Sequence, residues 1–136
     1  MNALESQLKI DEGYRNKVYL DSKGIPTIGV GRNLRDVGLF PDEIEMLLQN
    51  DIKRAQAACR AIFDNYATLP QDKADALANL AFNVGQKRLS GFKKMIAAVN
   101  DGDWVTAAHE ATNSLWYKQV GDRAKRIVAT LLSDDK

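Results

Sequence analysis

The strongest constraint on the fold of this chain is a long amphipathic pattern between residues 41 and 64. Pro41 suits the first position of a helix, and the acidic pair Asp42 and Glu43 suits the positive end of the helix dipole. The apolar residues of the pattern recur every three or four positions and are Ile44, Leu47, Leu48, Ile52, Ala55, Cys59, Ile62 and Phe63. A helix of about 24 residues is roughly 36 Å long, so it can join two lobes of a small protein.

The segment before this helix predicts a different kind of structure. Asn2 can cap a short helix that ends before Gly13. Two β-rich stretches, residues 18–20 and 26–31, flank the turn Asp21-Ser22-Lys23-Gly24. This arrangement of strand, turn and strand predicts a β-hairpin.

Helical patterns fill the rest of the chain. Pro70, Ser90, Asp103 and Asp122 each stand where a helix can begin, and residues 115–117 predict a short turn. We therefore expect one α+β domain over residues 1–136 that is mainly helical. Its expected parts are a small antiparallel β lobe (13–40), a long connecting helix (41–66) and a helical bundle lobe (1–12 and 67–136), with a cleft between the lobes.

Composition narrows the chemistry that the chain can perform. The 136 residues carry a net charge of +1, so the chain lacks the strongly basic character of a nucleic-acid binder. One histidine, His109, and one cysteine, Cys59, are too few for a zinc site with three or four such ligands, and no internal disulfide can form. We expect Cys59, Trp104 and Trp116 to lie in the core. An enzyme built on this chain would rely on its 18 aspartate and glutamate residues.

The sequence shows no targeting signal at its N-terminus, which lacks a basic start followed by an apolar run. It also contains no stretch of about 18 apolar residues, so we expect no membrane insertion. The expected place of synthesis is a cytoplasm, without a signal peptide.

Three polar residues stand together in the predicted elements of the first lobe. Glu12 ends the first helix, Asp21 ends the first strand and Thr27 lies in the second strand. A carboxyl group at the negative end of a helix is suited to act as a general acid, whereas one in a polar turn is suited to stay ionised. Two carboxyl groups with such different roles are what glycoside hydrolysis needs. The alternative is that Glu12 is an ordinary helix-end residue and Asp21 an ordinary turn former.

The spacing of Glu12, Asp21 and Thr27 resembles the catalytic pattern of the phage lysozymes, glycoside hydrolase family 24. The surrounding motifs Asp11-Glu12-Gly13, Tyr19-Leu20-Asp21 and Thr27-Ile28-Gly29-Val30-Gly31 are also similar to the family's N-terminal signature. Further similar segments are residues 81–85, 90–92, 116–117 and 123–126, so the resemblance covers nearly the whole chain. It implies a lysozyme-like fold.

The resemblance also implies an activity. Such enzymes are muramidases that cut the β-1,4 bond between N-acetylmuramic acid and N-acetylglucosamine in bacterial peptidoglycan. By analogy, Glu12 protonates the leaving oxygen, while Asp21 and Thr27 hold the attacking water, and the reaction inverts the anomeric carbon. No metal or organic cofactor is implied. The positions that match substrate-binding residues of the family are Gly31, Phe82, Asn83 and Ser90.

The same resemblance implies contacts for several charged residues. Arg123 matches a family arginine that pairs with the catalytic acid, so we expect it beside Glu12. Arg32 stands where some relatives carry a histidine that pairs with an aspartate on the long helix, and Asp51 occupies the matching place. We therefore expect a link between Arg32 and Asp51, with Arg32 charged at every accessible pH. Glu110 replaces a polar amide of the best-known relatives.

The expected partners also follow from the resemblance. The substrate is a peptidoglycan strand, no nucleic acid is involved, and the chain is expected to be a monomer. Made in a host bacterial cytoplasm, it would act on the cell wall after release through a holin-type pore and so cause host cell lysis. Two alternatives stay open: a non-catalytic peptidoglycan-binding module, and a lytic transglycosylase, whose chemistry uses a lone acid and forms an anhydro sugar.

Overall fold

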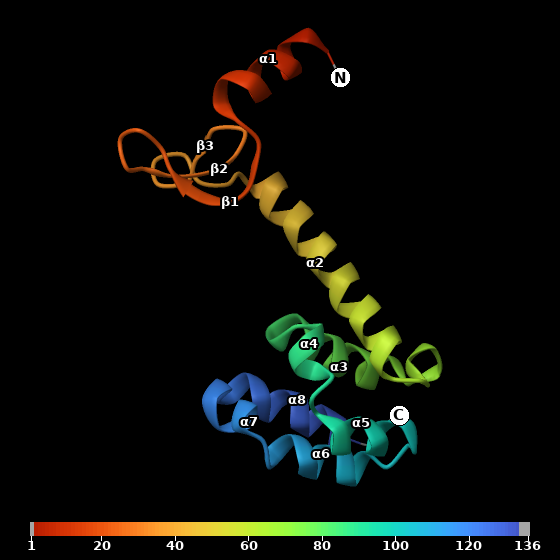
Figure 1. The fold of residues 1–136 in the computed structure, drawn as a ribbon. Coiled ribbons are helices and arrows are strands. Elements are labelled where there is room, and N and C mark those ends of the chain that lie inside the picture. Colours follow the sequence, from red (N-terminus) through yellow and green to blue (C-terminus); the bar gives the residue numbers. More distant parts are fainter. Residues whose placement is uncertain (1, 134–136) are drawn as a thin grey trace. The chain divides into compact units, whose positions relative to one another are not determined.

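In the computed structural model, which describes residues 2–133, the chain is mainly helical with one small antiparallel sheet (Figure 1). The first elements are α1 (Ala3–Glu12), β1 (Arg15–Leu20), β2 (Pro26–Gly29), β3 (Arg32–Asn33) and the long helix α2 (Pro41–Ile62). A 3₁₀ turn, η1 (Tyr66–Thr68), is followed by α3 (Gln71–Val84), α4 (Gln86–Leu89), α5 (Lys93–Asn100), α6 (Trp104–Thr112), α7 (Leu115–Val120) and α8 (Asp122–Leu132). The predicted α+β class is confirmed. Residue 1 and residues 134–136, which the predicted domain includes, lie outside the described residues.

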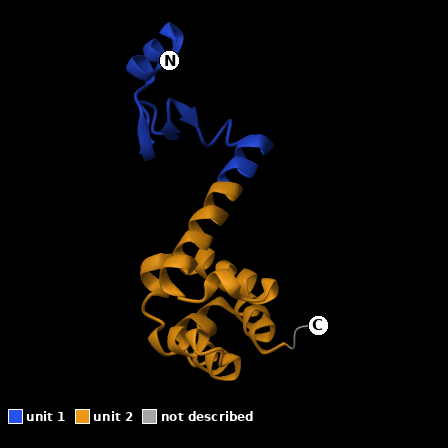
Figure 2. Ribbon diagram, turned by 90° about the vertical axis from the view of Figure 1, so that its right-hand side faces the viewer, with its two compact units in different colours: residues 1–47 blue, residues 48–136 orange. Residues whose placement is uncertain are grey.

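The chain divides into two compact units, residues 1–47 and residues 48–136, with the boundary inside α2 (Figure 2). The first unit holds α1, the sheet and the start of α2. The second unit holds the rest of α2 and the helices that follow. The expected placement of residues 1–12 in the helical lobe, and the expected cleft between the lobes, stay predictions.

The local signals in the first unit act as expected. Asn2 caps α1, because its Oδ1 accepts the Glu5 N–H at 2.8 Å. Gly13, with φ of +85°, ends the helix, and its N–H donates to the Lys9 carbonyl at 3.0 Å. β1 and β2 pair antiparallel as the predicted hairpin. β3 adds a short edge strand, so the sheet order is β1-β2-β3.

The second unit holds the main hydrophobic core, in which α3, α5, α6 and α8 pack together. Its largest fully buried side chains are Phe63, Leu77, Leu80, Leu89, Met95, Trp116, Ile127 and Leu131. Each buried side chain of this size contributes about 1.5–3 kcal/mol to stability. Of the three residues expected in the core, Cys59 and Trp116 are fully buried, and Trp104 is partly buried against it. Burial raises the pKa of the Cys59 thiol to about 12.

Two local predictions in this unit are wrong. Ser90 does not cap α5: its hydroxyl donates to the Lys87 carbonyl at 2.6 Å, and α5 begins three residues later without a side-chain cap. Residues 115–117 form the start of α7 rather than a turn, because Ser114 caps that helix by accepting the Tyr117 N–H at 3.2 Å. The predicted cap Asp103 is confirmed, since it accepts the Thr106 N–H at 3.1 Å. Among residues 2–133, no helix is long and apolar enough to cross a bilayer.

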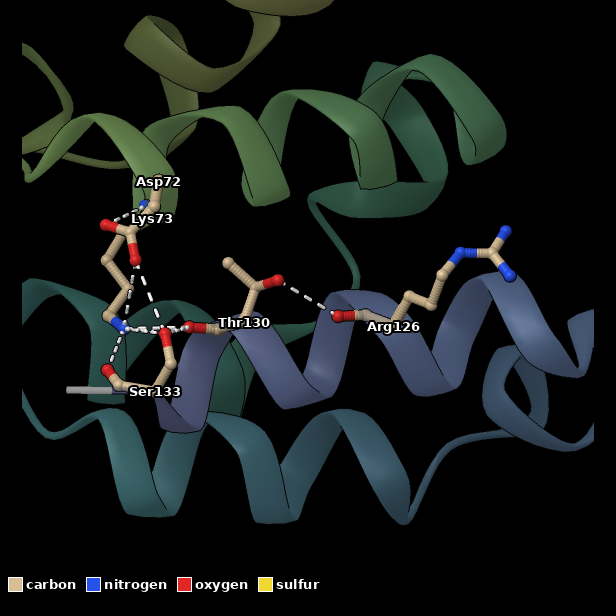
Figure 3. A network of polar contacts seen from close by, with 5 residues as sticks. All are labelled: Asp72, Lys73, Arg126, Thr130 and Ser133. Atoms are coloured by element: carbon tan, nitrogen blue, oxygen red, sulfur yellow. Dashed lines mark hydrogen bonds and ion pairs between the residues drawn. The ribbon is translucent and has the colours of Figure 1, made fainter. Parts of the chain in front are cut away.

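A buried lysine joins α3 to the end of α8 (Figure 3). Lys73 is only 3% exposed, and its Nζ donates to the Thr130 carbonyl at 2.7 Å and to the Ser133 carbonyl at 2.5 Å. The same nitrogen lies 3.7 Å from an Asp72 carboxylate oxygen and 5.8 Å from the centre of the Trp104 ring. The last carbonyls of a helix lack partners within the helix and form the negative end of its dipole. Lys73 therefore caps α8 from a neighbouring helix.

We predict that Lys73→Met lowers the free energy of unfolding by about 1–3 kcal/mol, because methionine keeps the bulk but leaves the two carbonyls without a donor. Urea denaturation followed by circular dichroism measures this. Lys87→Met, at an exposed lysine on α4, is the control and should change stability by less than about 0.5 kcal/mol. Equal stability of the two variants would show that the buried ammonium does not hold α8.

Candidate active site

Glu12 lies where the end of α1 meets the sheet of the first unit. It is the last residue of the helix, and the Tyr19 hydroxyl on β1 donates to its backbone carbonyl at 3.4 Å. The turn at Gly13 then leads the chain directly into β1. The side chain of Glu12 is exposed and extends toward Gly31, just after β2.

Gly31 is required by this arrangement for two reasons. Its φ is +69°, a left-handed conformation that residues with a Cβ rarely adopt. A Cβ at this position would also lie 2.8 Å from Cδ of Glu12 and even closer to its Oε2. The predicted site residues Glu12 and Gly31 are therefore in direct contact, and the glycine leaves the space that the carboxyl group occupies.

Asp21 and Thr27 are joined through the backbone of Ile25. The Oδ1 atom of Asp21 accepts the N–H groups of Lys23 at 2.8 Å and of Ile25 at 2.9 Å. The Thr27 hydroxyl donates to the Ile25 carbonyl at 2.9 Å. The two backbone N–H groups hold Oδ1 of the Asp21 carboxylate in the turn, and Oδ2 takes no part in these bonds. The Thr27 hydroxyl donates its proton to Ile25, so the lone pairs of the Thr27 hydroxyl oxygen stay available to accept a hydrogen bond.

Thr27 is also held by the sheet register. It pairs with Tyr19 on β1 and with Asn33 on β3, and it is only 4% exposed. Ile25 and Thr27 are the buried residues of the first unit among those described. A hydroxyl in this position has little rotational freedom, because its β-branched side chain is packed between two strands.

Arg32 has a partner in the first unit that sequence reasoning did not predict. The Arg32 guanidinium binds the carboxylate of Glu43 in the first turn of α2, and it also donates to the Gly38 carbonyl at 3.2 Å. Asp51 contacts Arg54 at 3.3 Å. Asp51 belongs to the second unit, so the expected link between Arg32 and Asp51 stays a prediction.

Sequence reasoning missed Glu43, although a local signal was present. Its carboxylate accepts the Phe40 N–H at 2.9 Å, which is the reach from the third residue of a helix back to its cap. The Arg32 hydrogen bond, helped by the Phe40 N–H, holds the pKa of Glu43 below its ordinary value. The same hydrogen bond raises the pKa of Arg32.

In the second unit, Phe82 and Asn83 stand at the end of α3. Phe82 is 43% exposed and borders two hollows of about 480 and 350 Å³ along α2 and α3. The side-chain oxygen Oδ1 of Asn83 accepts the Trp116 indole N–H at 2.8 Å. This bond fixes the orientation of the exposed side-chain amide, so its NH₂ group remains available to donate to a ligand.

The remaining predicted site residues have local partners. The Arg123 guanidinium donates to the side chain of Asn79 at 2.9 Å and to its carbonyl at 3.2 Å. The expected pairing of Arg123 with Glu12 stays a prediction. Ser90 is exposed and bonds to the backbone of α4, and its expected contact with substrate stays a prediction.

We predict that Glu43→Gln lowers the melting temperature at pH 7 and that this loss shrinks as the pH falls below about 4. The folded-state pKa of Glu43 lies below its unfolded value, so its contribution is present above the unfolded pKa and is lost as pH falls through the folded one. Thermal denaturation of both proteins across pH 3–7 measures the difference. Asp51→Asn is the comparison variant, and a larger pH-dependent loss in that variant would favour the predicted link between Arg32 and Asp51 over the contact with Glu43.

Comparisons with known proteins identify the family of this chain. The family model described as phage lysozyme matches residues 9–131. The central spike protein Gp5 of Enterobacteria phage T4 is 28% identical over 96% of this chain, which spans only 28% of that protein. The probable T4-type lysozyme 2 of Dictyostelium discoideum is 25% identical, over 95% of this chain and 93% of the relative. The endolysin of Salmonella phage P22 is 34% identical over 63% of each chain.

The predicted family resemblance is thereby confirmed. The family match includes Glu12, Asp21 and Thr27 as well as the helices that bury Trp116. The chain therefore belongs to the phage lysozyme family and is a glycoside hydrolase of the lysozyme type.

Proposed function

We propose that the chain hydrolyses the β-1,4 bond between N-acetylmuramic acid and N-acetylglucosamine in bacterial peptidoglycan, with inversion at the anomeric carbon. Family membership supports a muramidase-type peptidoglycan hydrolase. The single observation that carries the finer mechanism is the polar turn in which Asp21 and Thr27 share the Ile25 backbone.

That turn supplies what a hydrolytic water needs. A water that attacks must give up a proton, so it needs a fixed acceptor beside it. Because Asp21 Oδ1 is held by two backbone N–H groups, Oδ2 is free to accept from the water and to take its proton. The Thr27 oxygen provides a second acceptor, because its own proton is donated to Ile25.

Glu12 takes the opposite role in the proposed reaction. Its carboxylic acid gives a proton to the leaving glycosidic oxygen as the bond from the anomeric carbon to that oxygen breaks. The water oxygen forms the new bond to the anomeric carbon, and its proton passes to Asp21. An inverting enzyme of this kind needs roughly 6.5–9.5 Å between the two carboxyl groups, which leaves room for the water.

The second unit would contribute sugar contacts. The Asn83 NH₂ group, oriented by Trp116, can donate to a sugar hydroxyl or an acetamido carbonyl. Phe82 offers an exposed aromatic surface beside it. We further propose that the enzyme is a monomer, reaches the wall from a host bacterial cytoplasm through a holin-type pore, and so causes lysis.

The deciding experiment adds the protein to purified peptidoglycan and labels new reducing ends. Wild-type protein should release reducing ends, and Glu12→Gln should lower the rate by at least about 10²-fold, because the leaving oxygen loses its proton donor. Glu5→Gln, the same change at the other end of α1, is the control. Anhydro products would show a lytic transglycosylase, and binding without products would show a non-catalytic wall-binding module.

Asp21→Asn separates the two functions of that residue. Asparagine keeps an oxygen for the two backbone N–H groups, so the melting temperature should stay within a few degrees of wild type, while hydrolysis falls by about 10²-fold or more. Proton NMR of the first product formed by wild-type enzyme should show the α-anomer. Full activity of Asp21→Asn, or a β-anomer, would contradict the proposed mechanism.

Gly31→Ala tests the contact with Glu12, and Gly29→Ala is its matched control. Both glycines have positive φ, +69° and +68°, so both variants should lose about 1–2 kcal/mol of stability. Only the Cβ at Gly31 meets Glu12, because a Cβ at Gly29 has nothing within 4 Å. We expect kcat to fall about 10²-fold in Gly31→Ala alone, since the acid is displaced. Equal kcat in the two variants would contradict this role of Gly31.

A further inference from the structure

The hydroxyl of Tyr19 joins the proposed acid to the sheet of the first unit. It donates to the backbone carbonyl of Glu12 at 3.4 Å. Glu12 is the last residue of α1, and the carbonyl groups at the end of a helix lack partners within the helix. Because the carbonyl and the side chain of Glu12 share one Cα, a bond that restricts the carbonyl also restricts the direction of the side chain. Tyr19 can therefore influence where the carboxyl group points without touching it.

The Tyr19 side chain also lies beside Thr27. The two residues are directly paired across β1 and β2, and directly opposite side chains lie on one face of a sheet with their Cβ atoms about 4.5–5.5 Å apart. Thr27 is buried, and Tyr19 is the one residue of β1 that is not exposed. A single side chain thus links the end of α1, which carries Glu12, to the strand that carries Thr27.

The ring of Tyr19 is itself held by a cation. The guanidinium carbon of Arg15 lies 4.6 Å from the ring centre, which is close enough for a cation–π contact. The sheet register shifts between Arg15 and Tyr19, and irregularities of this kind redirect side chains at the edge of a sheet. Arg15 forms no salt bridge among residues 2–133, so Tyr19 is the partner that the structure gives to its charge.

We propose that Tyr19 is a positioning residue for the general acid Glu12, and that Arg15 holds the Tyr19 ring in place. This inference rests on the proposed function. In this role Tyr19 contacts neither the substrate nor the transferred proton. It keeps the end of α1 at a constant place relative to the strand of Thr27, so that the carboxyl group meets the leaving oxygen while the water is held. Displacing a proton donor lowers the rate steeply, because proton transfer requires hydrogen-bond distance.

Tyr14 supplies a matched comparison within the same unit. It follows Glu12 by two positions, and its ring also carries a cation, since the Lys9 ammonium lies 5.2 Å from the ring centre. Tyr14 is 72% exposed, and no hydrogen bond joins its hydroxyl to Glu12 in the described part of the chain. Tyr14→Phe therefore removes the same chemical group near the acid without removing a contact to it.

The test measures the cleavage of two soluble substrates by wild type, Tyr19→Phe and Tyr14→Phe. One substrate is a natural glycan fragment. The other ends in an N-acetylmuramic acid whose anomeric carbon carries a 2,4-dinitrophenyl group, which leaves as a stable anion and needs no proton donor. On natural glycan, Tyr19→Phe should lower kcat about tenfold while KM stays within about twofold of wild type. On the aryl substrate its kcat should stay within about twofold, and Tyr14→Phe should match wild type on both.

The comparison of substrates separates positioning from a merely structural role. A Tyr19→Phe protein that is partly unfolded would lose the same share of its activity on both substrates, and that result would overturn the inference. An unchanged kcat on natural glycan would overturn it as well. A rise in KM without a fall in kcat would place the phenol on the substrate, which also contradicts a positioning role.

Arg15→Gln tests the second half of the proposal. It should lower kcat on natural glycan about threefold, which corresponds to the loss of an exposed cation–π contact. Because Arg15 acts through the Tyr19 hydroxyl, the double variant Arg15→Gln, Tyr19→Phe should be within about twofold of Tyr19→Phe alone. Effects that multiply to a fall of about thirtyfold would show that Arg15 acts independently, and would refute the role assigned to it.

A measurement without substrate keeps the inference distinct from the proposed function. If wild-type protein cleaves neither substrate, the proposed function fails, and NMR of the full chain decides whether Tyr19 orients Glu12. The three-bond couplings between Hα and Hβ of Glu12 report its χ1 rotamer. We expect one staggered rotamer in wild type and in Tyr14→Phe, and averaged rotamers in Tyr19→Phe. Equal couplings in the three proteins would overturn the inference.

Discussion

The turn closed by the Asp21 carboxylate is the interaction on which the proposed site depends. Two backbone N–H groups converge on one of its oxygens, and the Ile25 carbonyl within the same turn receives the Thr27 hydroxyl. The hairpin therefore cannot form in this geometry without also fixing the two groups that would hold a water. The same hydrogen bonds therefore stabilise the turn and fix the orientation of both side chains, although the sheet is small.

The position of Glu12, the proposed acid, follows from backbone geometry within the first unit. Gly13 turns the chain out of α1 with a positive φ, and Gly31 admits the carboxyl group of Glu12 next to its own backbone. Both positions need a residue without a Cβ, the first because of its conformation and the second because of conformation and space together. Replacing either glycine disturbs the position of Glu12 without changing any ionisable group. The effect of that position can therefore be measured separately from the effect of the carboxyl group itself.

Sequence reasoning succeeded where a signal is local. The cap at Asn2, the stop at Gly13 and the start of α2 at Pro41 each depend on neighbours within a few residues, and each is confirmed. Sequence reasoning failed where the partner of a side chain depends on how helices and loops pack together. Arg32 binds Glu43 in the first turn of α2, a partner that sequence reasoning did not identify. Nothing local indicates that Lys73 reaches α8, or that Trp116 orients Asn83 from 33 positions away.

Lys73 shows how the second unit accommodates a buried charge. Lys73 is almost fully buried, yet its ammonium has two carbonyl acceptors, a carboxylate and an aromatic ring around it, so its charge is balanced within the fold. A charge that loses hydration and gains no bond destabilises a folded protein. Lys73 loses its hydration but gains these partners, so its burial links α3 to the end of α8 instead of weakening the fold.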